Sequence, residues 1–246
     1  MLHSYSVNRQ FLSGAGRCIG KQYWSHRGLS SKNHVMLFDI HVHSDISPCS
    51  HLALSDILNH SRRRGLDGVC ITDHGTMAVG SRVREGMQAD GLCVIVGMEY
   101  TTPQGDFLVF GPFEHLPPGL AAQDLLALVD LGAGAAVAAH PFRPGRTVVE
   151  SVLTSNACRL VEAVNGRNPA AANEQALALV RRRKVVGLGG SDAHSLDELG
   201  RMATRLHTPV HCRQDFIAAL RQGRCEEHVM PPLPAPMATR ASGNTR

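Results

Sequence analysis

The sequence predicts an α/β fold in which a mainly parallel sheet closes into one barrel-like domain. Short runs typical of strands alternate with segments typical of helices, which is the order found in β-α-β units. The strand-like runs are apolar throughout, and this indicates burial on both faces of the sheet. More than six such units follow one another without a linker, which favours a barrel over two open sheets.

Composition and charge argue against a membrane-spanning protein and against a nucleic-acid binder. A hydrophobic fraction of 43% is ordinary for a globular protein, and no apolar run is as long as a membrane span. Residues 1–38 hold five of the 25 basic side chains and no acidic one. The other 20 basic side chains are matched by 21 acidic ones. The body of the chain therefore lacks the basic bias expected of a nucleic-acid binder.

The two ends of the chain differ in composition from the body. Residues 1–35 are basic and rich in Ser, which fits either a transit-like leader or an extension that never folds. We favour the disordered extension, with the domain beginning at Met36. Residues 230–246 are rich in Pro, Ala, Ser and Thr, which predicts a disordered tail. The folded domain is therefore expected to span residues 36–229.

Seven cysteines are dispersed along the chain without a CxxC pair. An odd and scattered set indicates reduced thiols and a cytoplasmic protein rather than a disulfide framework.

The stretch Phe38 to His43, FDIHVH, alternates apolar and polar residues with the period of a strand. His41 and His43 then lie on one face, where two imidazoles one strand step apart can bind one metal ion. Asp39 shares this face and is expected to hold a ligand imidazole from behind. The alternative is a strand with a polar face turned to solvent.

The rest of the chain continues the alternation of helices and strands. Ser55 is expected to cap a helix that ends before Gly65. Later helices are expected near residues 78–89, 121–131, 148–153, 170–183 and 215–221. Strands are expected at residues 68–72, 92–96, 106–110, 135–139, 159–164, 185–189 and 204–208.

Six apolar runs end in polar clusters with the sequences HVH, TDH, MEY, AHP, NGR and SDAH. Because the carboxyl ends of barrel strands meet at one face, these clusters predict a shared site. The donor types suit Zn, Mn or Fe, and they are too many for one tetrahedral ion. Two or three ions, with Glu99 and Asp192 as bridges, would use the whole set. The candidate ligands are His41, His43, His74, Glu99, His140, Asp192 and His194.

The ordered series FDIHVHS, GVCITDHG, GMEY, AAHPFRPG, VEAVNGRN and GLGGSDAH resembles the PHP (polymerase and histidinol phosphatase) family. The resemblance implies a distorted (β/α)7 TIM-like barrel, a multinuclear metal site and hydrolysis of phosphate esters. It implies that His41 and His43 bind one ion with Glu99, which bridges to a second. It also implies that His74 and His140 serve the remaining ions, and that Asp192 and His194 complete the first site.

The chain departs from the family pattern at two places. Many members have an acid or a His shortly after the HxH pair, where this chain offers only Asp45 or Cys49. Many members also have a His in the strand after the Glu, and here Phe107 stands near that place. His115 lies beyond it, in a Pro-rich loop. These departures leave open whether a third ion is bound.

The expected activity is that of a phosphomonoesterase. Two ions can lower the pKa of a bridging water, so that the resulting hydroxide attacks phosphorus. Arg143 and Arg167 follow two site-facing strand ends, where a guanidinium can bind phosphate or make a loop salt bridge. Catalytic roles are expected for Arg143, Asp192 and His194. Glu162 is expected to support the site as a structural acid, and Asp73 to orient a neighbour.

Two other readings of the sequence compete with this one. The domain could be a metal-stabilised PHP module without catalysis, or a nuclease or other nucleotide-processing phosphodiesterase. The near-neutral body and the aromatic fraction of 4% disfavour nucleic acid and favour a small phosphorylated substrate. The sequence carries no code for the substrate's identity or for the oligomeric state.

Overall fold

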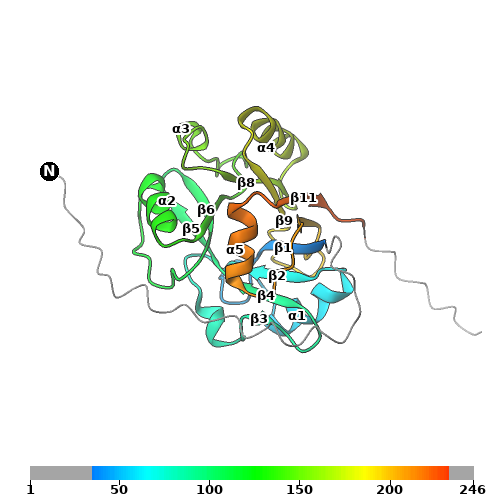
Figure 1. Ribbon diagram of the computed structural model, residues 1–246. Coiled ribbons are helices and arrows are strands. Elements are labelled where there is room, and N and C mark those ends of the chain that lie inside the picture. The colour runs from blue at the N-terminus through cyan, green and yellow to red at the C-terminus, as the bar shows by residue number, and fades with distance from the viewer. Residues whose placement is uncertain (1–34, 233–246) are drawn as a thin grey trace, which may run out of the picture.

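The computed structural model describes residues 35–232, which form two sheets with helices around them (Figure 1). The six strands of the first sheet lie in the order β11-β10-β1-β2-β4-β3, and the five strands of the second in the order β5-β6-β7-β8-β9. The strands are β1 (Met36–Val42), β2 (Gly68–Ile71), β3 (Gly86–Met87), β4 (Cys93–Val96), β5 (Met98–Thr102), β6 (Gly105–Phe110), β7 (Ala135–Ala138), β8 (Leu160–Asn165), β9 (Val186–Gly190), β10 (Met202–Leu206) and β11 (Cys225–Val229).

The α/β class is confirmed, but the expectation of a mainly parallel sheet is wrong. The pairs β1–β2, β2–β4, β7–β8 and β8–β9 are parallel, whereas β5 and β6 pair antiparallel, as do β6 and β7. Antiparallel pairing follows from the short connection between β5 and β6, because parallel neighbours need a crossover of a dozen or more residues. β10 and β11 add a further antiparallel pair beside β1.

Two single bridges join the sheets where the polar clusters lie. Val42 pairs with Ala193 in the parallel direction, and His74 pairs with Glu99 in the same way. The hydrogen-bonded strands of the described residues therefore form two sheets in contact, and the single closed barrel expected from the sequence is not formed by strand pairing alone.

One apolar core lies between the two sheets. Phe38, Ile40 and Ile95 of the first sheet pack in the same cluster as Leu108 and Phe110 of the second. Helix α5 (Arg213–Arg221) completes this cluster, because the Phe216 ring lies 5.7 Å from that of Phe38 and 5.0 Å from that of Phe110, centroid to centroid. A second cluster lies beneath the other helices.

Four further α-helices lie around the outside of the sheets (Figure 1). They are α1 (Leu54–Arg63), α2 (Ala122–Leu131), α3 (Glu150–Leu153) and α4 (Ala170–Arg183).

Three predictions about local structure are wrong. Residues 78–89 form only the 3-10 helix η2 (Ala78–Ser81) and the short strand β3, α1 begins after Ala53 without a side-chain cap at Ser55, and β11 follows the strand expected to be last.

Within residues 35–232, no helix combines the length and apolar character needed to cross a membrane. The sequence predictions for residues 1–34 and 233–246 lie outside the described residues.

The thiols of Cys49, Cys70, Cys93, Cys158 and Cys225 are free, as expected. Cys212 is disulfide-bonded, so the expectation of reduced thiols is wrong for that residue.

Candidate metal centre

His41 and His43 project from the end of β1 into the interior, where both are fully buried. Their Nε2 atoms lie 3.1 Å apart. The predicted strand alternation is the reason, since it sends residues two apart to the same face. The alternative of a solvent-facing polar side is therefore wrong for this strand.

Glu99, in β5 of the other sheet, lies at the middle of the histidines. Its Oε2 is 3.4 Å from His41 Nε2, 3.3 Å from His43 Nε2 and 3.0 Å from His74 Nδ1. Its Oε1 is 2.8 Å from His140 Nε2. One carboxylate thus contacts imidazoles that belong to both sheets, and each of its oxygens has separate partners.

Asp192 follows β9 and contacts the same two histidines at the end of β1. Its Oδ1 lies 3.5 Å from His41 Nε2 and 3.3 Å from His43 Nε2, and its Oδ2 lies 2.6 Å from an Arg143 nitrogen. Asp192 and His140 both have positive φ, 56° and 30°. Non-glycine residues adopt this region at a cost, and they do so most often at functional sites.

His194 lies beside His43 and His74, whereas the family resemblance implies that it completes the first site with Asp192. Its ring centroid lies 4.4 Å from that of His43 and 6.4 Å from that of His74, and these three residues can place donor atoms within 4.8 Å of one another. Its Nδ1 lies 3.6 Å from Asp192 Oδ1 but 2.8 Å from the Asp192 backbone oxygen. All seven candidate ligands are therefore brought together, with His194 nearest to His43 and His74.

Glu162, and not Asp39, supports the His41 ring. Glu162 Oε1 lies 3.0 Å from His41 Nδ1, and its Oε2 accepts hydrogen bonds from the His140 backbone N–H at 2.7 Å and from Asn165 Nδ2 at 3.0 Å. Asp39 instead accepts hydrogen bonds from Ser191 and from the Gly200 N–H at 2.9 Å. The prediction for Asp39 is wrong because its carboxylate holds the loop after β9.

Asp73 orients a neighbouring loop, as expected. It accepts hydrogen bonds from the Ser44 hydroxyl at 2.6 Å, the Ser44 N–H at 2.8 Å and the Ser47 hydroxyl at 2.6 Å. The Ser47 oxygen in turn lies 3.3 Å from His43 Nδ1 and accepts the His74 N–H at 3.1 Å. The loop after β1 therefore fixes two of the candidate ligands at once.

Two arginines predicted to bind phosphate line an open pocket of about 430 Å³ beside these ligands. Arg143 donates to Asn165 Oδ1 at 2.7 Å and Asn168 Oδ1 at 3.0 Å. Arg167 lies 3.3 Å from a carboxylate oxygen of Glu198. The pocket is lined by Pro48, Cys49, His74, Glu99, Thr101, Arg143, Arg146, Arg167, Asp192 and His194.

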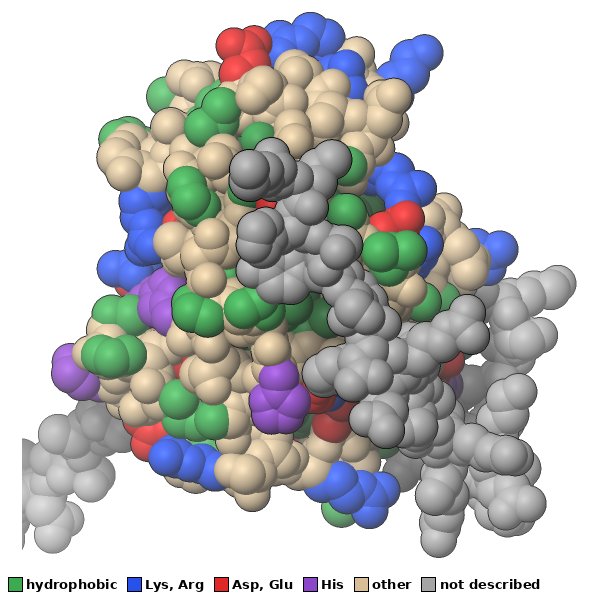
Figure 2. All heavy atoms as spheres, turned by 90° about the vertical axis from the view of Figure 1, so that its left-hand side faces the viewer, with side chains coloured by type: hydrophobic (Ala, Val, Ile, Leu, Met, Phe, Trp, Pro, Cys, Tyr) green, Lys and Arg blue, Asp and Glu red, His purple; other side chains and the backbone are tan. Residues whose placement is uncertain are grey.

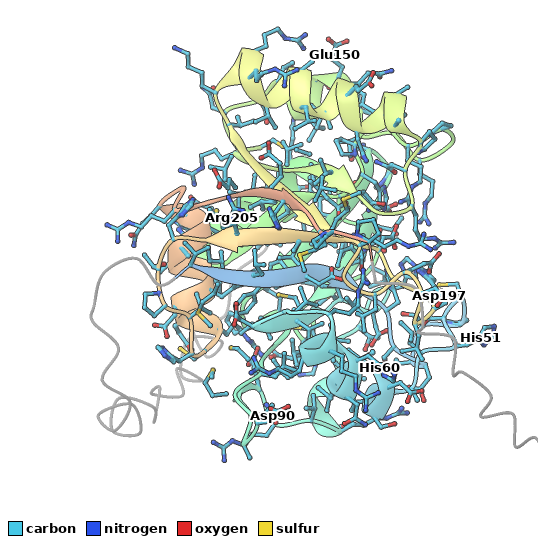
Figure 3. The ribbon with its side chains drawn as sticks, turned by 90° about the vertical axis from the view of Figure 1, so that its right-hand side faces the viewer. His51, His60, Asp90, Glu150, Asp197 and Arg205 are labelled. Atoms are coloured by element: carbon cyan, nitrogen blue, oxygen red, sulfur yellow. The ribbon has the colours of Figure 1, made fainter. Side chains whose placement is uncertain are left out.

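The residues at which the chain departs from the family pattern lie outside the clusters of possible ligands that residues 35–232 contain. Asp45 is half exposed and pairs with Arg82 at 3.0 Å, away from the histidines. Cys49 is exposed at the pocket, and the exposed His115 is outside every cluster of possible ligands found in the described residues. Phe107 is fully buried in the apolar core. Of the remaining histidines, His51 lies at the molecular surface, directed outward (Figure 3).

Asp106, the residue before Phe107, lies beside the candidate ligands, although no motif in the sequence predicted it. Asp106 is 2% exposed and can place a donor atom within 4.8 Å of donors from Glu99 and His140. The available signal was a carboxylate inside an otherwise apolar strand, since alternation puts Asp106 and Phe107 on opposite faces.

The donor atoms around His41 have the spacing that a divalent ion requires. Four tetrahedral ligands held at 2.0–2.1 Å from Zn lie about 3.3–3.4 Å from one another. The five measured distances among His41 Nε2, His43 Nε2, Glu99 Oε2 and Asp192 Oδ1 run from 3.1 to 3.5 Å. The donor set therefore fits a metal ion.

Electrostatics in the centre also fit a cation. Burial disfavours a charged His41, yet Asp192, Glu162 and Glu99 raise the pKa of His41 well above its usual value. Burial acts against ionised Glu99 and Asp192 as well, but His41 holds the pKa of both well below the usual range. Burial and the nearby His43 lower the pKa of His194 to about 4, which leaves a neutral imidazole at pH 7.

The fold and this centre define an α/β protein with a buried cluster of histidines and carboxylates whose donor atoms could hold metal ions. Residues 39–166, just over half of the chain, match the PHP domain, and residues 170–225 match the PHP-associated region. The chain belongs to the PHP-domain family.

A curated relative and several solved structures are similar to the chain. The uncharacterized protein MJ1587 of Methanocaldococcus jannaschii is 28% identical over 119 residues, which cover 44% of this chain and 70% of the relative. PsfC from Pseudomonas syringae superposes with a TM-score of 0.67 at 22% identity, covering 80% of this chain and 92% of its own.

Two further structures share the fold at lower identity. A two-domain protein from Bacteroides vulgatus, described as containing a predicted PHP-like metal-dependent phosphoesterase, has a TM-score of 0.61 at 16% identity over 80% of this chain and 66% of that one. The lesion-specific endonuclease PfuEndoQ from Pyrococcus furiosus has a TM-score of 0.60 at 15% identity over 79% and 58% of the two chains.

Proposed function

We propose that the protein is a metal-dependent phosphomonoesterase that hydrolyses small phosphorylated substrates with two or three divalent ions. The observation that carries this proposal is the position of Glu99. Its two oxygens face different imidazoles at 2.8 to 3.4 Å, which is the arrangement a carboxylate adopts between two ions. Arginines line the pocket beside it, where a phosphate would be held.

The proposed ligands divide among the ions by proximity. His41, His43, Asp192 and one oxygen of Glu99 would hold the first ion, for which their mutual distances are suitable. His140 and the other oxygen of Glu99 would serve a second ion. A third would lie near His43 and draw on His74 and His194. Zn, Mn and Fe all accept these donors.

Bound divalent ions would supply an activated water and positive charge beside the phosphate oxygens. The chain supplies binding and orientation. Arg143 is held by Asp192, Asn165 and Asn168, so its guanidinium enters the pocket in a fixed position. Arg167, with a side chain 40% exposed, lies at the pocket beside His194. Both cations would bind phosphate oxygens, whose charge grows in the transition state.

We also infer that residues 36–229 are the catalytic domain, and that its two sheets are a distorted (β/α)7 barrel of the PHP type. The bridges Val42–Ala193 and His74–Glu99 support this, because each joins the two sheets near the proposed ligands. The TM-scores of 0.61 and 0.67 with the Bacteroides protein and PsfC support a common architecture.

Cleavage of a nucleic acid is the second candidate. The shared fold with the P. furiosus endonuclease favours it. Charge argues against it, since residues 39–246 carry 20 basic and 21 acidic side chains. On the face shown in Figure 2, basic side chains of the described residues are interspersed with acidic and apolar ones. A small phosphorylated substrate is therefore the better match.

The test is hydrolysis by metal-stripped protein that has been reloaded with Mn, Zn or Fe. Substrates are a panel of phosphomonoesters, a phosphodiester and duplex DNA with and without an abasic site. His41→Gln and Asp192→Asn should lower kcat/KM for the preferred monoester by about 100-fold or more, because each removes a proposed ligand. His207→Gln and Asp45→Asn, both outside the site, should retain wild-type activity.

Full activity in His41→Gln and Asp192→Asn would refute the assignment of the site. If duplex DNA is hydrolysed in preference to every monoester, the proposed function would be that of an endonuclease and not of a phosphomonoesterase.

A further inference from the structure

We propose that Asp106 is a ligand of the second metal ion, together with Glu99 and His140. The inference rests on the proposed metal-dependent function and deepens it. It assigns a residue that the motifs did not predict and that stands next to the position at which many family members have a His.

The register of the β5–β6 hairpin directs Asp106 to the site. Glu99 pairs with Leu108, and Thr101 pairs with Asp106 two residues further along each strand. Residues directly opposite in an antiparallel pair share a face, as do residues two apart on one strand. Glu99, Thr101 and Asp106 are therefore on one face, and both Glu99 and Thr101 line the pocket. Phe107 lies on the other face, in the apolar core.

The carboxylate of Asp106 is more buried than its ion pair explains. Asp106 is 2% exposed, and its Oδ2 lies 3.1 Å from Nε of Arg146, whose side chain is 47% exposed. A buried carboxylate requires close compensation of its charge, and a half-exposed guanidinium is partly screened by water. A divalent ion on the inner side would supply the remaining compensation.

The neighbours of Asp106 are metal-ligand types in suitable positions. Donor atoms of Glu99, Asp106 and His140 lie within 4.8 Å of one another, and Glu99 Oε1 is 2.8 Å from His140 Nε2. His140 is 1% exposed, and its Nδ1 lacks a hydrogen-bond partner among the described residues. A buried ring nitrogen without a partner is costly unless a ligand uses it or the ring turns to one.

Arg146 fits a supporting role behind a ligand. Carboxylates that bind metals are commonly held by a second hydrogen-bonding group. Anchoring of the loop that carries Arg146 is a weaker explanation for the pair. That loop is already fixed by backbone hydrogen bonds from the Val148 N–H to Pro141 O at 2.9 Å and from the Val149 N–H to Gln104 O at 2.8 Å.

The test counts bound ions rather than turnover. Metal-free protein is dialysed to equilibrium against Mn or Zn, and the ions per chain are measured by mass spectrometry. Asp106→Asn should bind one ion fewer than wild type. Asp106→His should retain the wild-type count, because imidazole can replace the carboxylate as a ligand. Arg146→Gln should also retain it.

Asp45→Asn is the matched control, since Asp45 also pairs with an arginine, Arg82, at 3.0 Å but lies outside the site. It should bind as many ions as wild type.

A full count of ions in Asp106→Asn would overturn the inference and leave the proposed function standing. If Asp106→Asn does not fold, Asp106→Ala takes its place, and a wild-type number of bound ions in that variant would also overturn the inference. Wild-type protein that binds no ion would refute the proposed function itself and this inference with it.

Discussion

At the scale of single residues, Glu162 connects three parts of the centre. Its carboxylate contacts the His41 ring, the His140 backbone and the Asn165 side chain. Through Nδ1 it fixes the orientation of His41 and leaves Nε2 directed at Glu99 and Asp192. Loss of a group that holds a ligand imidazole in this way typically lowers metal affinity by roughly 10- to 100-fold.

Replacement of Glu162 by Gln tests this role. We expect the affinity for the first ion to fall by about 10- to 100-fold, because an amide holds the imidazole less strongly than a carboxylate does. Competition with a chromogenic chelator measures the change. Glu150→Gln, at the surface in α3, is the control and should bind metal as wild type does (Figure 3). An unchanged affinity in Glu162→Gln would contradict the role.

Metal binding is expected to release protons. Surrounding carboxylates outweigh burial and raise the pKa of His41 well above its usual value. We therefore expect the metal-free imidazole to carry a proton at pH 7. A metal ion needs the neutral ring, so binding at pH 7 should expel that proton and affinity should fall as pH is lowered.

Titration calorimetry at pH 7 in two buffers of different ionisation enthalpy measures this release. The observed heats should differ between the buffers by an amount that corresponds to about one proton or more. Equal heats in both buffers would show that His41 is already neutral before the metal binds.

The residue types of the site were predictable because strand ends are recognisable in the sequence. HVH, TDH, AHP and SDAH each follow an apolar run, and the structure brings all their histidines together. Asp106 was not predicted because its place beside Glu99 and His140 depends on the register of a hairpin. A slip of one residue exchanges the two faces of a strand, so Phe107 rather than Asp106 was placed at the site.

At the scale of elements, β9 can approach β1 because it ends in glycine. A Cβ added to Gly190 would lie 2.6 Å from the His41 Cβ and 2.6 Å from Glu162 Oε1. Both distances are shorter than any ordinary contact. The close approach places the residues after β9, including Asp192, beside the histidines of β1.

Substitution of Gly190 by Ala should therefore damage the fold and the centre together. We expect the free energy of unfolding to fall by about 1–3 kcal/mol from overpacking, and metal affinity to fall because His41 and Glu162 are displaced. Denaturant unfolding and chelator competition measure the two effects. Gly80→Ala, where the nearest atom would be 3.9 Å from the new Cβ, should change neither. Wild-type stability and metal affinity in Gly190→Ala would show that β1 and β9 can move apart without loss of either, which would contradict this prediction.

The connection between β4 and β6 illustrates what could not be predicted about elements. The sequence predicted strands near 92–96 and 106–110, and both exist, but β5 between them was not recognised as a strand. The local pattern of residues 98–102 is mixed because one face of β5 carries Glu99, a candidate metal ligand, rather than apolar side chains. Tertiary contacts, which local patterns do not encode, stabilise this strand.

At the scale of the whole molecule, the centre is where the two sheets meet. The first sheet contributes His41 and, after β2, His74; the second contributes Glu99 and, after β7, His140. Both bridges between the sheets involve residues in or next to this set. The α/β class followed from the alternation of elements, whereas the division into two sheets depends on long-range pairing that periodicity cannot reveal.

We infer that these donors form one centre able to hold more than one divalent ion. Equilibrium dialysis of the metal-free wild-type chain against Mn or Zn, followed by mass-spectrometric determination of metal per chain, tests it most directly. We predict two or three tightly bound ions. A chain that binds none, or only one, under conditions in which it is folded would contradict it.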